Sequence, residues 1–190
     1  MASSLEILAS TLGVACVLLT IRRHFACWPT GLAMVLLYIY IFYEARLYSD
    51  MLLQVVYVFL QVYGWYAWLH GGPDRTPLVV SRLPVWQVAP WLAVGITTAA
   101  LLGGMMHGFT NASFPYIDAV ASVASLIAQW LMGRKVLESW LVWIFVDVVS
   151  IGLYFSKELY PTAGLYLVFL GLALWGWFEW RSAWKRQATA

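Results

Sequence analysis

Long apolar runs and short polar breaks alternate along the whole chain. Each run approaches the roughly 20 residues that a helix needs to cross the hydrocarbon core of a bilayer. Seven runs qualify, at residues 5–21, 27–43, 47–69, 86–106, 115–133, 137–155 and 160–180. The breaks between them hold most of the charged residues. The pattern therefore predicts an all-α integral membrane protein with seven spanning helices and no substantial soluble domain.

The composition supports this fold class. Of the 190 residues, 63% are hydrophobic and 11% are charged, whereas globular chains are about half apolar and a quarter charged. A soluble fold of this size would leave too much apolar surface in water. The first run ends at Arg22-Arg23 without a small-residue cleavage site, and no basic segment precedes it. We therefore expect it to remain as a spanning helix rather than to act as a cleaved signal peptide.

The basic residues predict the orientation of the helices. With seven spans, one side of the membrane receives Arg22, Arg23, Arg75, Arg82, Arg134, Lys135, Arg181, Lys185 and Arg186. The other side receives Arg46 and Lys157. Because Lys and Arg gather in cytoplasmic loops, we expect the N-terminus outside and the C-terminus in the cytoplasm.

The chain also carries an internal repeat. A shift of 112 positions brings chemically similar residues into register without a gap. The matched pairs are Glu6 and Asp118, Arg22-Arg23 and Arg134-Lys135, Trp28 and Trp140, Leu47-Tyr48 and Leu159-Tyr160, Gly64-Trp65 and Gly176-Trp177, and Trp68 and Trp180. Acidic, basic, glycine and aromatic positions agree in one register, which argues against chance matching between apolar helices.

Each repeat contains three predicted helices, and this odd number requires a connecting helix. Three spans leave the chain on the opposite face of the membrane, so the helix at 86–106 restores the orientation. The predicted organisation is a first repeat at residues 1–70, a loop and linker helix at 71–112, a second repeat at 113–182 and a cytoplasmic tail at 183–190. Parallel 3+1+3 repeats of the SWEET type occur in transporters, whose sites lie near the bilayer midplane between the repeats.

A carboxylate lies near the middle of one predicted helix. Asp147 is close to the centre of the span at 137–155, where a charge costs about 2.5–3.5 kcal/mol on insertion scales. Trp140 and Trp143 precede it by seven and four residues and so share its helical face. Two aromatic planes and a carboxylate suit a flat cationic ring, through stacking, cation–π attraction and charge balance.

A second polar stripe follows the third predicted helix. Gln54, Tyr57 and Gln61 are spaced at i, i+3 and i+7, and Trp65 continues the face. A glutamine amide both donates and accepts hydrogen bonds, which fits a ribose hydroxyl or an amide of a ligand. Interhelical hydrogen bonding is the structural alternative for these residues. Gln129, toward the inner end of its predicted helix, fits either role.

The sequence predicts no metal or cofactor site. Cys16 and Cys27 are too few and too poorly spaced for a disulfide framework or a zinc site. His24, His70 and His107 fall at separate helix ends. No Walker-type phosphate loop, no Gly-x-Ser-x-Gly elbow and no His–carboxylate pair at one depth is present. We therefore expect no cofactor, no nucleic-acid partner, no ATP-driven step and no enzymatic activity.

The arrangement of these motifs resembles the PnuC family over nearly the whole chain. In the first half the matching runs are Trp28-Pro-Thr-Gly31, Phe42-Tyr-Glu-Ala-Arg-Leu-Tyr48, Leu53-Gln54-Val and Tyr63-Gly-Trp-Tyr-Ala-Trp68. In the second half they are Arg134-Lys135, Glu138-Ser-Trp140-Leu-Val-Trp143, Asp147-Val-Val-Ser150 and Leu159-Tyr160. The Tyr-Gly-Trp-Tyr-x-Trp and Glu-x-Trp-x-x-Trp elements are fairly specific in combination.

The resemblance implies a transporter of the bacterial inner membrane with the 3+1+3 fold. The PnuC family carries vitamins, chiefly nicotinamide riboside, and has thiamine-transporting relatives. Its members work by facilitated diffusion, and phosphorylation inside the cell makes the uptake directional. It implies that Trp140, Trp143, Asp147, Gln54 and Gln61 lie near the substrate. Some nicotinamide riboside members carry Asn at the positions of Asp147 and Gln61. Both vitamins contain a cationic ring, so the charge of Asp147 leaves the choice between them open.

Other functional classes remain as alternatives. A SWEET-type sugar carrier shares parallel three-helix repeats, but a neutral sugar needs no counter-charge such as Asp147. A non-transporting membrane receptor or scaffold would bind its ligand without translocation. The expected partners are the vitamin and the surrounding lipid, and the sequence leaves open whether the chain forms a homo-oligomer.

Overall fold

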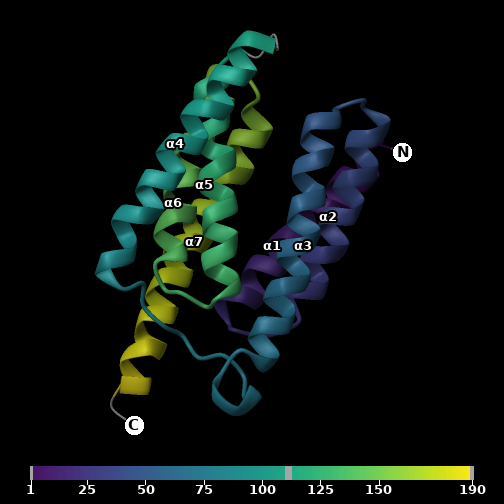
Figure 1. Cartoon of the computed structure of the whole chain (residues 1–190). Coiled ribbons are helices and arrows are strands. Elements are labelled where there is room, and N and C mark those ends of the chain that lie inside the picture. Colours follow the sequence, from purple (N-terminus) through teal and green to yellow (C-terminus); the bar gives the residue numbers. More distant parts are fainter. Residues whose placement is uncertain (1, 110–112, 189–190) are drawn as a thin grey trace. The chain divides into compact units, whose positions relative to one another are not determined.

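The computed structural model describes residues 2–109 and 113–188, and these ranges contain seven α-helices (Figure 1). The helices are α1 Ala2–Ile21, α2 Cys27–Glu44, α3 Tyr48–His70, α4 Val85–Phe109, α5 Pro115–Gly133, α6 Ser139–Ser156 and α7 Tyr160–Ala188. A short 3₁₀ helix, η1 Pro73–Arg75, lies between α3 and α4. Each of the seven is long and apolar enough to cross a membrane. The predicted all-α fold class with seven spans is therefore confirmed.

Helix α7 is longer than the predicted span at 160–180. It continues to Ala188, so the described part of the predicted tail at 183–190 is helical, while residues 189 and 190 lie outside the described residues. Arg186 donates to Ser182 at 2.8 Å and pairs with Glu179 at 4.0 Å, which are neighbours on one helix face. Hydropathy shows only where an apolar run ends. A helix forms its backbone hydrogen bonds internally, so it can continue beyond the apolar layer into polar surroundings.

The chain forms two compact units. The first contains Met1–Val79 and Gly133–Lys135, and the second contains Val80–Met132 and Val136–Ala190. In the first unit α1 packs on α2 and α2 packs on α3. In the second unit α6 packs on α7, and Gly103 of α4 lies against the ring of Tyr116 of α5. Helix α4 thus belongs to the same unit as α5–α7.

Equivalent turns end helices in both units. Arg23 and Lys135, 112 positions apart, have φ values of 58° and 56°, and Arg46 and Glu158, also 112 apart, have 58° and 59°. A residue in this left-handed conformation at a helix C-terminus allows the following N–H to reach back five residues. These bonds run from His24 to Leu19, Val136 to Leu131, Leu47 to Phe42 and Leu159 to Tyr154, all at 2.8–3.0 Å. Four charged residues occupy positions that usually favour glycine.

A tryptophan pair joins α2 to α3 in the first unit. Trp28 and Trp68 contact edge to face, with centroids 5.4 Å apart and planes at 82°. Gly64 lies beneath the Trp28 ring, where any side chain would collide with it. Glycine is therefore required here for close approach rather than for backbone freedom.

The same packing recurs 112 positions later, between α6 and α7. Trp140 and Trp180 contact edge to face, with centroids 5.5 Å apart and planes at 87°. A methyl group on Gly176 would lie 2.6 Å from the Trp140 ring. Each unit thus builds one close helix contact from a Trp–Gly–Trp set.

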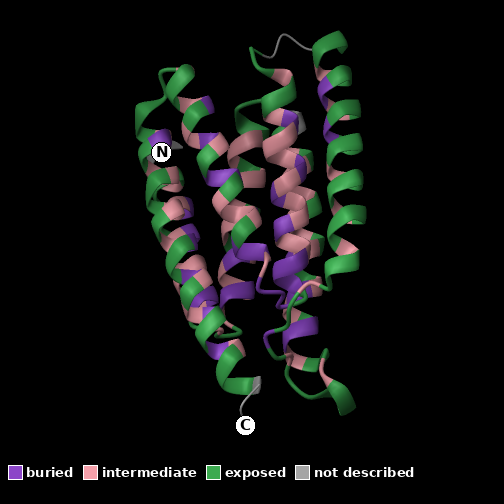
Figure 2. Ribbon diagram, turned by 90° about the vertical axis from the view of Figure 1, so that its left-hand side faces the viewer, coloured by how far each residue is buried: buried purple, intermediate pink, exposed green. Residues whose placement is uncertain are grey.

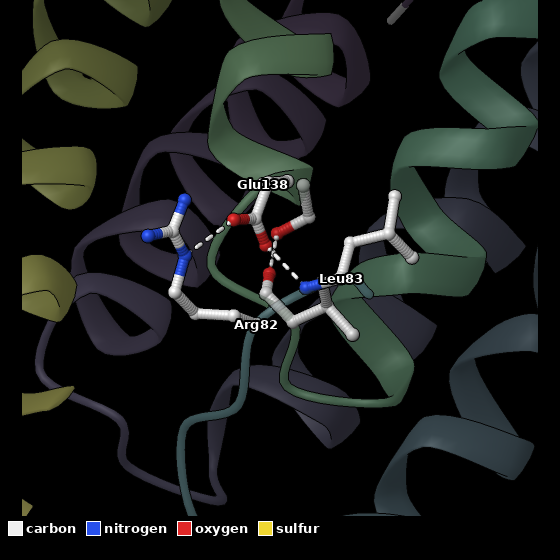
Figure 3. A network of polar contacts seen from close by, with 5 residues as sticks. Arg82, Leu83 and Glu138 are labelled. Carbon is white, nitrogen blue, oxygen red and sulfur yellow. Dashed lines mark hydrogen bonds and ion pairs between the residues drawn. The ribbon is translucent and has the colours of Figure 1, made fainter. Parts of the chain in front are cut away.

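Polar contacts are present at both ends of α6 in the second unit. At the end of α6, Lys157 pairs with Asp118 at 3.1 Å. Before its start, Glu138 accepts a hydrogen bond from Nε of Arg82 at 2.8 Å and one from the backbone N–H of Leu83 at 2.7 Å (Figure 3). The start of α5 and the end of α6 therefore share one end of this unit, as consecutive antiparallel helices should.

Large apolar side chains cover much of the exterior. Phe59, Ile96, Leu101 and Phe178 are each more than 60% exposed. Figure 2 shows the exposed positions, in green, along the outer helix surfaces. Such an exterior would aggregate in water but is appropriate in lipid.

Candidate functional site

Asp147 is a buried carboxylate in the middle of a spanning helix. It lies halfway along α6, and only 3% of its surface is exposed. Its carboxylate makes no hydrogen bond or ion pair with any residue that the structure describes. A carboxylate in such surroundings must take up a proton or face a cation, because an unpaired buried charge is costly. The intramembrane position makes it the leading functional candidate.

The two tryptophans that precede Asp147 on α6 differ in their surroundings. Trp143, one turn before Asp147, is half-buried. Trp140 is 2% exposed and is held by Gly176 and Trp180 of α7. Trp143 therefore retains ring surface that a ligand can contact, whereas most of the Trp140 ring is committed to packing. The sequence pattern did not separate these two roles.

Gln61 is the most buried of the predicted polar residues on α3. It is 5% exposed, and its Oε1 atom has no hydrogen-bond partner among the described residues. Its amide lies against Gly31 of α2, where any side chain would displace it. A buried amide oxygen without a partner is costly, and such an oxygen is available to a ligand hydroxyl or amide.

The remaining predicted site residues are half-buried. Gln54, Tyr57 and Trp65 lie on α3 in the first unit, and Gln129 lies on α5 in the second. The predicted site residues therefore form two sets, one in each unit. The first set is on α3 and the second is on α5 and α6.

Lys135 has a buried and specific environment, although its place in the sequence indicated only the orientation of the helices. Its Nζ donates to the backbone oxygen of Leu78 at 2.8 Å and lies 4.4 Å from the ring centroid of Trp68. Burial, reinforced by the positive charge of Arg23, lowers the pKa of Lys135 from 10.5 to about 8. A basic pair in a short loop gives no sequence signal of such burial.

An apolar cavity of about 500 Å³ opens in the second unit between α5 and α6. Its lining includes Tyr116, Val120, Val148 and Ser156. This lining offers few polar groups, so it suits a hydrocarbon chain better than a vitamin with hydroxyl groups. No group of three or more His, Cys, Asp or Glu in the described part of the chain could hold a metal ion.

The family described as nicotinamide mononucleotide transporter matches residues 3–182. The chain belongs to this transporter family. The match confirms the resemblance that the sequence motifs indicated, and it covers both units.

Named members of the transporter family align with nearly the full chain. The nicotinamide riboside transporter PnuC of Escherichia coli is 28% identical over 214 residues, covering 99% of this chain and 90% of the relative. PnuC of Neisseria mucosa is 27% identical, covering 98% of this chain and 75% of the relative. The riboflavin/roseoflavin transporter RibM of Streptomyces davaonensis is 28% identical, covering 92% and 83%. These relatives are transporters and not enzymes.

A solved family structure supports the fold. The crystal structure of the vitamin B3 transporter PnuC superimposes with a TM-score of 0.78 at 27% identity, covering 97% of this chain and 83% of that one. Together with the seven apolar helices and the bacterial relatives, this makes the chain a multi-pass protein of the bacterial inner membrane.

Proposed function

We propose that the chain carries nicotinamide riboside across the bacterial inner membrane by facilitated diffusion. Membership of the transporter family and the full-length similarity to a nicotinamide riboside transporter support transport. The observation that supports a cationic vitamin is the carboxylate of Asp147 in the middle of α6, which has no partner among the described residues. The sequence contains no energy-coupling motif, so the carrier alone would only equilibrate the vitamin across the membrane. Phosphorylation inside the cell would then keep the imported vitamin from leaving.

The charge of the ring separates the vitamins that the relatives carry. The nicotinamide ring of the riboside is a pyridinium cation, whereas the flavin ring of riboflavin is neutral at pH 7. An ionised Asp147 would balance the pyridinium, and the half-buried Trp143 would offer a face for stacking and cation–π attraction. Thiamine, with its cationic thiazolium, fits the same reasoning and is the second candidate.

We assign the uncharged parts of the substrate to the amide and aromatic side chains. Gln61, with its unpartnered Oε1, is the first choice for a ribose hydroxyl or the carboxamide. Gln54, Tyr57 and Trp65 share its helix, and Gln129 supplies a further amide. Trp140 would act indirectly, by holding α6 against α7.

We further propose that two parallel three-helix repeats, α1–α3 and α5–α7, are joined by α4, with the N-terminus outside and the C-terminus in the cytoplasm. Equivalent turns at Arg23 and Lys135 support a common repeat. The Trp–Gly–Trp packing that recurs after 112 positions supports it independently. The excess of basic residues on one side supports the orientation.

Exchange across a sealed membrane tests the transport proposal. The purified chain is reconstituted into liposomes without ATP or an ion gradient and loaded with unlabelled nicotinamide riboside. Labelled nicotinamide riboside should enter and then equilibrate, and excess riboflavin should compete poorly. Exchange of thiamine without exchange of nicotinamide riboside would make thiamine the substrate. Saturable riboflavin exchange without nicotinamide riboside exchange would overturn the assignment to a cationic vitamin.

The role of Asp147 is tested in the same vesicles. Asp147→Asn keeps the shape but removes the charge, and we expect affinity for nicotinamide riboside to fall by roughly 100-fold, since loss of one partner of a buried charge pair costs about 2–5 kcal/mol. Glu158→Gln, which removes an exposed carboxylate outside the helices, should have no effect. Unchanged affinity in Asp147→Asn would leave transport standing but remove the counter-charge role.

A further inference from the structure

A second, smaller cavity in the second unit is polar and positively charged. Its volume is about 210 Å³, and it lies near the start of α6 and the last turns of α7. It is lined by Arg82, Leu137, Trp177, Arg181, Trp184 and Lys185. Three cations and two indole rings around one small cavity are unusual in a protein with so few charges.

The α7 residues of this cavity form one helix face. Trp177, Arg181, Trp184 and Lys185 are spaced at i, i+4, i+7 and i+8. About 20 residues of helix cross the hydrocarbon core, so α7, which begins at Tyr160, reaches the edge of the apolar layer near Trp177. The charged part of the face therefore lies at the depth of the lipid headgroups, with tryptophans as interfacial residues.

The third cation of the cavity is held in place from another segment. Nε of Arg82 donates to Glu138, whose second oxygen accepts the N–H of Leu83. The Arg82 guanidinium also lies 5.3 Å from the ring centroid of Trp184. Figure 3 shows that Nε alone makes the bond to Glu138, and the two terminal nitrogens have no hydrogen-bond partner among the residues that the structure describes. A guanidinium held in this way presents two donors in a planar fork, the geometry that matches phosphate oxygens.

Most residues that line this cavity have no chemical counterpart in the first unit. Helix α3 ends at His70, which corresponds to Ser182 after the shift of 112 positions. Trp184 and Lys185 then correspond to Gly72 and Pro73. The cavity depends on the extension of α7 beyond the repeated scaffold, so the repeat does not explain it.

We propose that this cavity binds a phosphate group, and that the group belongs to the headgroup of an acidic phospholipid. Phosphate accepts charge-assisted hydrogen bonds from Arg and Lys, and basic pockets beside spanning helices bind anionic headgroups. The headgroup depth of Arg181 and Lys185 favours a lipid over a soluble phosphate. Such a lipid would bridge α7 and the segment that carries Arg82.

Lipid binding to the purified, delipidated full chain tests the proposal. Phosphatidylglycerol and phosphatidylcholine are titrated separately, and bound lipid is counted by native mass spectrometry. Inorganic phosphate and glycerol 3-phosphate, at constant ionic strength, form the soluble arm. We expect saturable binding of phosphatidylglycerol, little binding of phosphatidylcholine and no competition by millimolar soluble phosphate.

The double variant R181Q/K185Q tests the cavity, and R186Q is its control. Each cation near the surface is worth about fivefold in affinity, so the double variant should bind phosphatidylglycerol roughly 25-fold more weakly. R186Q removes a positive charge from the same helix end but not from the cavity lining, and it should bind nearly as the unsubstituted chain does. R181Q alone, with about a fivefold loss, serves if the double variant is not monodisperse.

Three results would overturn the proposal. Equal weakening in R186Q and in R181Q/K185Q would reduce the effect to general surface charge. Equal binding of phosphatidylcholine would remove the role of the acidic headgroup. Binding of inorganic phosphate without phosphatidylglycerol would assign the cavity to a soluble phosphate instead of a lipid. None of these readouts requires transport, so the transport proposal stands or falls separately.

Discussion

The two units share a packing contact but differ in chemistry one to two turns further along the same helices. Each has a Trp–Gly–Trp set with nearly the same ring geometry. With the shift of 112 positions, Gly31 corresponds to Trp143, Val35 to Asp147 and Gln61 to Ala173. One unit therefore has a buried amide against a glycine, where the other has a half-buried indole and a buried carboxylate.

This difference separates the features that both units have from those that only one of them has. The tryptophan–glycine contact recurs because it sets the distance between two helices in either unit. Under the proposed function one buried carboxylate is enough, because one cationic ring needs one counter-charge and a second buried acid would only destabilise the fold. A repeated residue is thus a candidate for structure, and a residue present in one copy is a candidate for function.

The largest expected effect comes from placing the acid in the wrong unit. Val35 is fully buried in α2, and Val35→Asp should destabilise the protein by about 2.5–3.5 kcal/mol. Val35→Thr, similar in shape and uncharged, should cost much less. Thermal unfolding in detergent, followed by fluorescence-detected gel filtration, measures the difference. A Val35→Asp protein as stable as the Thr variant would refute the claim that the first unit excludes a charge.

The reciprocal substitution, Asp147→Val, should have the opposite sign. It removes a buried carboxylate that has no partner among the described residues, so the melting temperature without substrate should rise while nicotinamide riboside binding is lost. A lower melting temperature would mean that Asp147 stabilises the fold, and the contrast between the units would then be structural only.

The second prediction tests the shared scaffold. Gly64→Ala and Gly176→Ala insert a methyl group into the rings of Trp28 and Trp140, and overpacking of this kind costs about 1–3 kcal/mol. Both variants should lose thermal stability by similar amounts. Gly171→Ala on α7 is the matched control, because a methyl group there meets nothing within 4 Å. Loss in only one of the two variants would break the structural equivalence of the units.

The third prediction concerns Trp143, which replaces a glycine of the first unit. Trp143→Ala should weaken nicotinamide riboside binding by about 1–2 kcal/mol if the indole stacks on a cationic ring, with little change in melting temperature. Phe145→Ala, at an exposed position on the same helix, is the control. Isothermal titration calorimetry measures both affinities. Equal affinities for the two variants would assign Trp143 to packing alone.

The sequence predicted the fold class and the helices because both follow from local hydropathy. It could not place the end of α7, since the polar residues after Trp180 remain helical through pairs such as Arg186 and Glu179. The repeat register was visible in Trp28 and Trp140 because large aromatic residues are rare enough to align.

The candidate site was only partly predictable. The depth of Asp147 followed from helix length, but its lack of a partner required coordinates. The spacing of Trp140 and Trp143 put both on one face, yet spacing carries no information about the glycine on α7 that receives the first ring. The burial of Lys135 depended on Trp68 and Leu78, distant segments that no local pattern connects to it.

The smallest expected effect is a pH dependence of the stability of the first unit. Because the pKa of Lys135 is lowered from 10.5 to about 8, the unfolded chain binds more protons than the folded chain between these two values. Stability therefore rises with pH from about 8 to 10.5 and does not depend on this group below pH 8. The melting temperature in detergent should increase by a few degrees over the lower part of that range.

Lys135→Met isolates this contribution from other groups that titrate at alkaline pH. It keeps the length of the side chain beside Trp68 but removes the charge that burial and Arg23 disfavour. The variant should be more stable than the unsubstituted chain at pH 7.5, and the gap should narrow as the pH rises, because the unsubstituted lysine becomes neutral in the folded state. A gap that is constant or widens between pH 7.5 and 9.5 would show that Lys135 stays charged, with the carbonyl of Leu78 and the Trp68 ring compensating for its burial.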